Sequence, residues 1–105
     1  MPQFAVHRNP NRATRAKIPL LLDVQSDLLE SLNTRVVIPL YIPAAAEDGI
    51  IGTLTPRIEV EHTSYIAMTP ELAGIPRKSL GAPVGNLSHR RHDIIAALDL
   101  LLTGI

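Results

Sequence analysis

Nine prolines and six glycines interrupt the 105-residue chain and divide it into short segments. Proline removes a backbone donor and glycine weakens regular structure, so this punctuation favours short strands joined by turns. The last segment differs, because Ile94, Ile95, Leu98, Leu101 and Leu102 recur at the spacing of one helical face. The sequence therefore predicts a β-rich domain with one amphipathic helix at its C-terminal end.

The composition is that of a single globular domain spanning residues 1–105. Hydrophobic residues make up 46% of the chain and charged residues 19%, which is typical of a packed domain and not of a disordered chain. Cysteine is absent, so disulfides and thiolate zinc sites are excluded. No apolar run reaches the ~18 residues that a membrane span requires. We therefore expect a cytoplasmic protein without membrane contact.

The formal net charge is zero, but the charges are unevenly distributed. Arg8, Arg12, Arg15 and Lys17 all precede Asp23, the first acidic residue. A basic stretch of this kind favours an acidic partner or a phosphate backbone, and a solvated loop is the alternative interpretation. The overall neutrality argues against a dedicated DNA-binding protein.

Two segments have the alternation of half-buried strands. The first covers Gln3–Arg8 and the second covers Arg57–Met68, which we expect to fold back as a hairpin near Thr63 and Ser64. In the second segment, His62 is expected on the same face as the apolar residues before it.

Two apolar runs, over Ile18–Val24 and Val36–Ile42, suit central strands or strands buried on both faces. Pro19 and Pro39 must then lie at edges, ends or bulges, because proline donates no hydrogen bond to a sheet. Asp27–Asn33 is expected to be the connection between these strands.

The remaining segments carry signals for turns and for helix ends. Ala44–Asp48 and Pro70–Leu72 are each expected to hold a turn of helix, and Gly74–Gly85 a loop with at most one short strand. Ser88 is expected to cap the start of the C-terminal helix and Gly104 to end it.

The sequence offers little for catalysis or for metal binding. His89 and His92 are three apart on the predicted helix, but no carboxylate motif accompanies them, and solvated histidines are the simpler interpretation. Ser26 lies between Asp23 and Asp27 without a histidine or lysine nearby in sequence to activate it. We therefore expect no catalytic residue, no metal and no cofactor.

Four motifs follow one another along the chain: DVQSD at 23–27, VIPL at 37–40, LSHR at 87–90 and Gly-Ile at 104–105. Shorter matches at 68–69, 75–76 and 93–94 lie between them. With these residues the chain resembles the CcdB family, the gyrase-poisoning toxins of type II toxin–antitoxin modules. The similarity runs along the whole chain, with a few extra residues near the N-terminal loop.

The resemblance implies a β-rich α+β fold: an SH3-like antiparallel barrel of the CcdB/MazF type, with a small extra sheet and one C-terminal α-helix. It implies a two-fold homodimer that binds the DNA gyrase A subunit and traps the cleaved gyrase–DNA complex. No bond is made or broken by such a toxin, so the family is not enzymatic. A cognate CcdA-like antitoxin neutralises it, and the two together repress their operator DNA, as in plasmid maintenance modules.

The resemblance also implies which residues touch each partner. Gyrase contacts fall on the loop after the first apolar run and on the helix end: Ser26, Leu28, Leu29, Asp99, Leu101, Leu102, Thr103, Gly104 and Ile105. Leu101 is the one of these that could instead serve the dimer contact. The antitoxin is expected at Arg8, Arg12 and Arg15.

The chain departs from the best-known members at the helix. They carry tryptophan in place of Thr103 and asparagines in place of Ala96 and Asp99, and an acid and an amide stand where this chain has Arg91 and His92. Because tryptophan is a favoured hot-spot residue, an inactive remnant that still binds antitoxin is one alternative.

A MazF-like ribonuclease is the other alternative. It would need an acid or base together with an arginine that stabilises phosphate charge. Arg35, Arg57 or the pair His89 and His92 would have to supply these groups.

Overall fold

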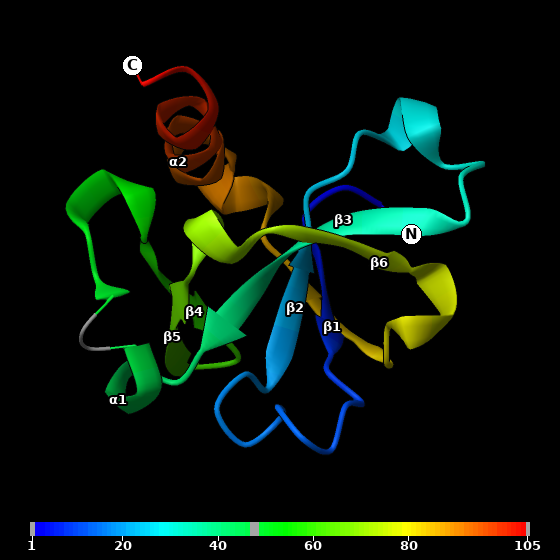
Figure 1. The fold of residues 1–105 in the computed structure, drawn as a ribbon, viewed down its shortest axis with the longest axis horizontal. Coiled ribbons are helices and arrows are strands. Elements are labelled where there is room, and N and C mark those ends of the chain that lie inside the picture. The colour runs from blue at the N-terminus through cyan, green and yellow to red at the C-terminus, as the bar shows by residue number, and fades with distance from the viewer. Residues whose placement is uncertain (1, 47–48, 105) are drawn as a thin grey trace.

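The computed structural model describes residues 2–46 and 49–104. Its strands (β), α-helices (α) and short 3-10 turns (η) follow one another along the chain (Figure 1): β1 Ala5–Arg8, β2 Leu20–Asp23, η1 Asp27–Leu29, β3 Thr34–Tyr41, α1 Pro43–Ala46, η3 Gly52–Leu54, β4 Arg57–Val60, β5 Thr63–Ala67, η4 Thr69–Glu71, β6 Ala73–Pro76, η5 Arg77–Ser79, β7 Pro83–Asn86, η6 Ser88–Arg90 and α2 Arg91–Thr103.

The described strands form one curled antiparallel sheet with the order β4-β5-β3-β2-β1-β7, and β6 pairs with the free part of β3. The ends of this path approach each other, since a Cβ built on Gly85 of β7 would lie 3.6 Å from Val60 Cγ1 of β4. The fold is therefore a half-barrel with one long helix, the β-rich SH3-like class expected. The small extra sheet that the resemblance implies is not separate among the described residues, because the β4–β5 hairpin joins β3 through two residue pairs and belongs to the same sheet.

The core fills the inside of the curl and is closed by α2. Val6, Leu22, Ile38 and Ile58 are buried there from four different strands, and Ile94 is buried from the helix. Burying a side chain of this size contributes about 1.5–3 kcal/mol, so the helix is held mainly by its apolar face. The residues of β2 that face away from this core, Leu21 and Asp23, are buried as well, which confirms that this strand is covered on both sides.

Pro39 lies inside β3, yet its missing N–H does not interrupt the hydrogen bonding of β3 with the neighbouring strands. It faces Leu21 of β2, and its carbonyl accepts from Met68 N at 3.0 Å on the other edge. In an antiparallel strand the N–H and C=O of one residue face the same neighbour, so the missing donor points to this second edge. There β3 changes partner from β5 to β6, and a donor is not needed.

Two expectations for the chain after β5 were wrong. The segment Gly74–Gly85 holds two strands, β6 and β7, on either side of η5. Pro83 starts β7, a position at the end of the sheet where no further strand requires its donor. Gly81 makes the crossing between them possible, because a Cβ there would meet Arg8 O at 2.6 Å.

The start of the helix also differs from the expectation. Ser88 belongs to η6, and α2 begins at Arg91 without a side-chain cap. Arg90 donates to Asp93 at 2.9 Å, which offsets the unfavourable cation at the helix start. The end of the helix was predicted correctly: Gly104 adopts φ 77° and its N–H donates to Leu100 O at 3.0 Å.

Tyr41 ties the end of β3 to η4. Its hydroxyl donates to the Glu71 carboxylate. Burial, together with this hydrogen bond and the negative charge of Glu71, raises the pKa of Tyr41 to about 12.

The β4–β5 hairpin turns at Glu61 and His62, two residues before the expected position. Both residues adopt positive φ, 50° and 67°. A two-residue hairpin loop requires this conformation, which asparagine and glycine adopt far more readily than other residues. His62 is therefore exposed in the turn instead of lying on the buried face with Ile58.

Replacing the turn by Glu61→Asn with His62→Gly should stabilise the protein. Positive φ costs an ordinary L-residue about 1 kcal/mol, so we expect the free energy of unfolding to rise by about 1–2 kcal/mol. Urea titration followed by circular dichroism measures it. The matched control is Glu61→Ala with His62→Ala, which removes the same side chains without favouring positive φ. Equal stability of the two double variants would show that the turn carries no strain.

Candidate functional site

The predicted gyrase residues lie on two separate projections at one edge of the molecule. Figure 1 shows η1 and the end of α2 at the same edge, on opposite sides of it. Leu28 is 94% exposed at η1, and Leu102 is 72% exposed at the helix end. The structure therefore places both groups where one large partner could cover them, but they do not form one continuous patch.

The η1 projection is built by its own capping turn. Ser26 accepts from Leu28 N through its hydroxyl at 3.2 Å, and Gln3 N donates to the Asp27 carboxylate at 2.8 Å. These bonds turn the chain so that Leu28 and the half-exposed Leu29 point away from the sheet. Leu32 of the same loop is exposed as well, and a group of neighbouring exposed apolar side chains is a common sign of an interaction site, whereas a single one is not.

Buried groups behind this loop hold it in place. Gln25, which is buried, donates to Leu29 O at 3.0 Å and accepts from Val36 N at 3.0 Å. From the other side, Arg77 donates to the carbonyls of Glu30 and Leu32. A loop fixed from both sides loses little conformational freedom on binding, and this favours affinity.

One buried ion pair supports the same loop from below. Arg35 Nε and Asp23 Oδ2 are 2.7 Å apart, and both side chains have 0% exposure. The second carboxylate oxygen of Asp23 accepts from Gln25 N at 3.0 Å. The pair therefore links β2, β3 and the start of the loop. Within the DVQSD motif, Asp23 supports the loop from the core, whereas Ser26 and Asp27 belong to the projecting turn itself.

The helix end carries the other predicted residues. Thr103 is exposed, and its hydroxyl donates to Asp99 O at 2.6 Å. The hydroxyl is therefore bonded to the backbone of the preceding helical turn. Leu101 is half-buried, and the exposed Gly104 closes the helix in the left-handed conformation. Ile105 lies outside the described residues.

The sequence reasoning missed apolar residues beside this helix. Ile51 is 59% exposed directly before η3, a turn that packs against α2. Ile50 beside it is 43% exposed. The signal was present as two adjacent isoleucines between Gly49 and Gly52, a place where a turn leaves apolar side chains without cover.

The predicted antitoxin residues lie together at the end of β1 and on the β1–β2 loop that follows it. Arg8, Arg12 and Arg15 line a hollow of about 470 Å³ with Ala16 and Pro19. All three arginines are exposed, so the loop presents a concentrated positive charge to solvent.

The residues considered for catalysis do not converge. His89 and His92 are exposed at the start of the helix. Residues 2–46 and 49–104 hold no group of three or more His, Asp or Glu side chains that could bind a metal ion. Arg35, a candidate for binding RNA phosphate, is buried in its ion pair with Asp23.

No helix in the described part of the chain is long and apolar enough to cross a membrane. A comparison with protein-family models gives a match to the CcdB protein family over residues 3–104. The match covers both projections up to Gly104, the β1–β2 loop and the buried support between them.

Proposed function

Because this chain belongs to the CcdB family, we propose that it is the toxin of a type II toxin–antitoxin module and a poison of DNA gyrase. It binds the gyrase A subunit and traps the enzyme on cleaved DNA. It makes and breaks no bond itself. As in the family, two copies associate as a homodimer in the cytoplasm, where a CcdA-like antitoxin binds Arg8, Arg12 and Arg15 and neutralises the toxin. Operator DNA is bound only together with that antitoxin.

The exposed Leu102 beside the left-handed Gly104 is the observation that carries this proposal. A glycine at this position allows close approach of a partner backbone, and a leucine that is 72% exposed provides an apolar contact. Gyrase contacts at Ser26, Leu28 and Leu29, and at Asp99, belong to the same proposal.

Deleting residues 103–105 should abolish gyrase poisoning and leave the fold intact. Supercoiled plasmid, purified gyrase of the host, ATP and the protein are incubated together, and the linear DNA released is measured. We expect at least tenfold less linear DNA from the shortened protein, because the residues removed are proposed to contact gyrase and do not pack in the core. Circular dichroism confirms that the variant is folded.

Thr103→Trp is the matched variant that separates a toxin from a remnant, because it restores the family's tryptophan. A full-length protein that releases no linear DNA, while Thr103→Trp releases it, would make this chain an inactive remnant. No linear DNA from either protein would overturn gyrase as the target. Linear DNA that the deletion leaves undiminished would remove the proposed site.

A further inference from the structure

The first described residues form a turn whose conformation is unusual for its sequence. Ala5 N donates to Pro2 O at 3.1 Å, which closes a β-turn. β1 therefore begins at Ala5 and not at Gln3, where the alternation predicted it. Phe4, the third residue of the turn, adopts φ 70°. Glycine and asparagine are favoured at such a position, and a bulky residue is strained there unless its surroundings impose the conformation.

One side of this turn is bonded to the segment that builds the η1 projection. Gln3 N donates to the Asp27 carboxylate at 2.8 Å, and the Gln3 side-chain amide donates to Val24 O at 3.1 Å. Phe4 N donates to Asp23 O at 2.6 Å. These bonds join the turn to the end of β2 and to the first residue of η1.

The other side of the turn is bonded to the segment that starts the C-terminal helix. Phe4 O accepts from Leu87 N at 2.8 Å, directly before η6. Both residues are buried, so water does not compete for this bond. Arg91, the first residue of α2, has its guanidinium carbon 5.6 Å from the centre of the Phe4 ring, which is within the range of a cation–π contact. Phe4 therefore contacts both segments.

The positive φ of Phe4 follows from these contacts. Its N–H is directed to Asp23 and its C=O to Leu87, while its ring is buried in the core. A glycine would adopt the same φ without strain, but it would leave the place of the ring empty. A turn that only started β1 would not need the bonds of Gln3 to η1. Strain that is kept at a link between two elements indicates that their relative placement matters.

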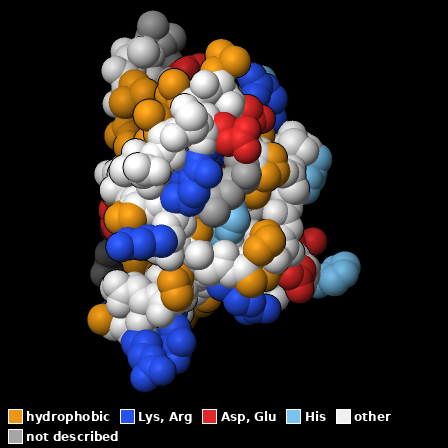
Figure 2. Space-filling view, turned by 90° about the vertical axis from the view of Figure 1, so that its right-hand side faces the viewer, with side chains coloured by type: hydrophobic (Ala, Val, Ile, Leu, Met, Phe, Trp, Pro, Cys, Tyr) orange, Lys and Arg blue, Asp and Glu red, His pale blue; other side chains and the backbone are white. Residues whose placement is uncertain are grey.

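The figures place this turn between the two projections. In Figure 1 the start of the chain lies between η1 and the first turn of α2, in agreement with its hydrogen bonds. Figure 2 shows hydrophobic side chains at the top of the molecule, the height at which Figure 1 places η1 and the end of α2. The turn is thus joined to the base of two projections that present apolar side chains at one edge.

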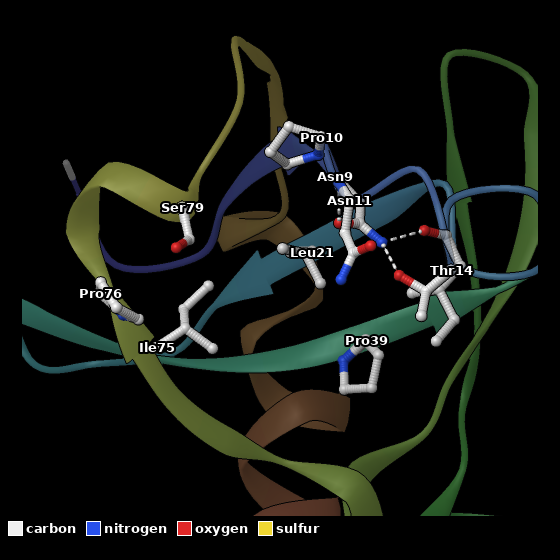
Figure 3. A pocket seen from close by; sticks show the side chains of 10 residues that line it. Asn9, Pro10, Asn11, Thr14, Leu21, Pro39, Ile75, Pro76 and Ser79 are labelled. Carbon is white, nitrogen blue, oxygen red and sulfur yellow. Dashed lines mark hydrogen bonds between the residues drawn. The ribbon is translucent and has the colours of Figure 1, made fainter.

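Two hollows of the molecule do not extend from one projection to the other. The hollow in Figure 3, of about 430 Å³, lies between the Asn9–Thr14 loop and Ile75–Ser79, and no residue of η1 or α2 lines it. A hollow of about 350 Å³ on the helix is lined by residues of α2 alone. A ligand in either hollow would not fix the spacing of the projections, whereas the bonds of the turn reach both.

We propose that residues 2–4 hold the two projections in one relative placement for gyrase, with Gln3 and Phe4 as positioning residues that act through the elements they join. The proposal rests on the proposed function for the partner. Two contacts on one rigid frame bind together readily, whereas a loose second contact must be ordered at each binding event. Gln25 and Arg77 fix the η1 loop to the sheet, and the turn fixes it relative to α2.

Gln3→Pro tests the proposal because it removes the bonds of Gln3 to η1 and keeps the turn. Proline is favoured at the second position of a β-turn and has no N–H to donate to Asp27. Gln3→Ala is the matched control, because it removes the side-chain amide and leaves the backbone donor in place. Both variants keep the net charge and the Phe4 ring. Circular dichroism confirms that each variant is folded.

The first readout is the spacing of the projections in the absence of gyrase. The chain has no cysteine, so Ser31→Cys after η1 and His92→Cys on α2, both exposed, provide two unique places for spin labels. Double electron–electron resonance gives the distribution of the distance between the labels. We expect this distribution to be about twice as wide in Gln3→Pro, and nearly unchanged in Gln3→Ala. An equally narrow distribution in Gln3→Pro would overturn the proposal.

The second readout is the half-maximal concentration for linear DNA in the gyrase cleavage reaction. We expect Gln3→Pro to raise it about fivefold and Gln3→Ala less than about twofold. Leu28→Ser should raise it about tenfold in the unaltered protein but only about twofold in Gln3→Pro, because a contact that is no longer positioned contributes little. A general loss of stability would not change the effect of Leu28→Ser. An unchanged effect of about tenfold would therefore overturn the positioning role.

The two readouts separate this proposal from the proposed function. No linear DNA from the unaltered protein would overturn gyrase as the target, and the label distances would still decide whether the turn fixes the projections. Linear DNA together with equal distance distributions would overturn the positioning role alone and leave gyrase poisoning in place.

Discussion

Arg35→Met is expected to lower the free energy of unfolding by about 3–5 kcal/mol, because it leaves the Asp23 carboxylate buried without its cation. Both side chains have 0% exposure, so water cannot replace the missing partner. Arg35 is also the largest fully buried side chain among the described residues. For a domain of 105 residues, a loss of this size is a large part of the total stability.

The control for this prediction removes both charges together. Replacement of a buried ion pair by apolar residues of similar volume is often neutral, so Asp23→Leu with Arg35→Met should cost less than Arg35→Met alone. Urea titration gives both values, and a double-mutant cycle with Asp23→Leu gives the coupling. A loss below about 1 kcal/mol for Arg35→Met would show that the pair contributes little to the folded state.

The same substitution should loosen the η1 loop. Asp23 holds Gln25 N, and Gln25 in turn bridges Leu29 O and Val36 N. Hydrogen exchange at Leu28 and Leu29 should therefore be faster in Arg35→Met than in the unaltered protein, and at least as fast in the double variant, which also loses the acceptor of Gln25 N, under conditions where all three are folded.

The sequence predicted those parts of the fold that depend only on the residues of the element itself, such as its apolar spacing or a terminal glycine. The apolar face of α2 and its end at Gly104 follow from spacing and from the freedom of glycine at positive φ. The two-sided burial of β2 follows from its unbroken run of apolar residues. Each of these needs no knowledge of what the element packs against.

Tertiary pairing decided the parts that local signals missed. The turn at Glu61–His62 carries no asparagine or glycine, and pairing of β4 with β5 imposes positive φ on both residues. β6 and β7 are rich in proline and glycine, and they exist because β3 and β1 offer them unpaired edges. Ser88 has a side chain that often caps a helix. Here its N–H donates to Asn86 Oδ1 at 2.8 Å, and Ser88 begins the 3-10 turn η6 instead of capping α2.

The sequence predicted which residues belong to the candidate site, but not how they are arranged in space. The resemblance gave Leu28 and Leu102, and the structure separates them into two projections at one edge. Asp23 and Gln25 belong to the DVQSD motif of the resemblance, yet both are buried and act as supports.

Leu28→Ser and Leu102→Ser should each raise the protein concentration needed to trap gyrase by about tenfold or more. A central apolar contact in an interface is worth about 2 kcal/mol or more, and these two side chains are 94% and 72% exposed. Because neither packs in the core, we expect the free energy of unfolding to change by no more than about 0.5 kcal/mol. The readout is the half-maximal concentration for linear DNA in the gyrase cleavage reaction.

The double variant tests whether one gyrase molecule covers both projections. Contacts at separate places add, so the two fold-changes should multiply. Ile42→Ser is the matched control, since Ile42 is a partly exposed apolar residue next to α1, at the other end of the molecule in Figure 1. Unchanged trapping by Leu28→Ser would restrict the gyrase contact to the helix end. The rigid support of the η1 loop by Gln25 and Arg77 would then serve another partner.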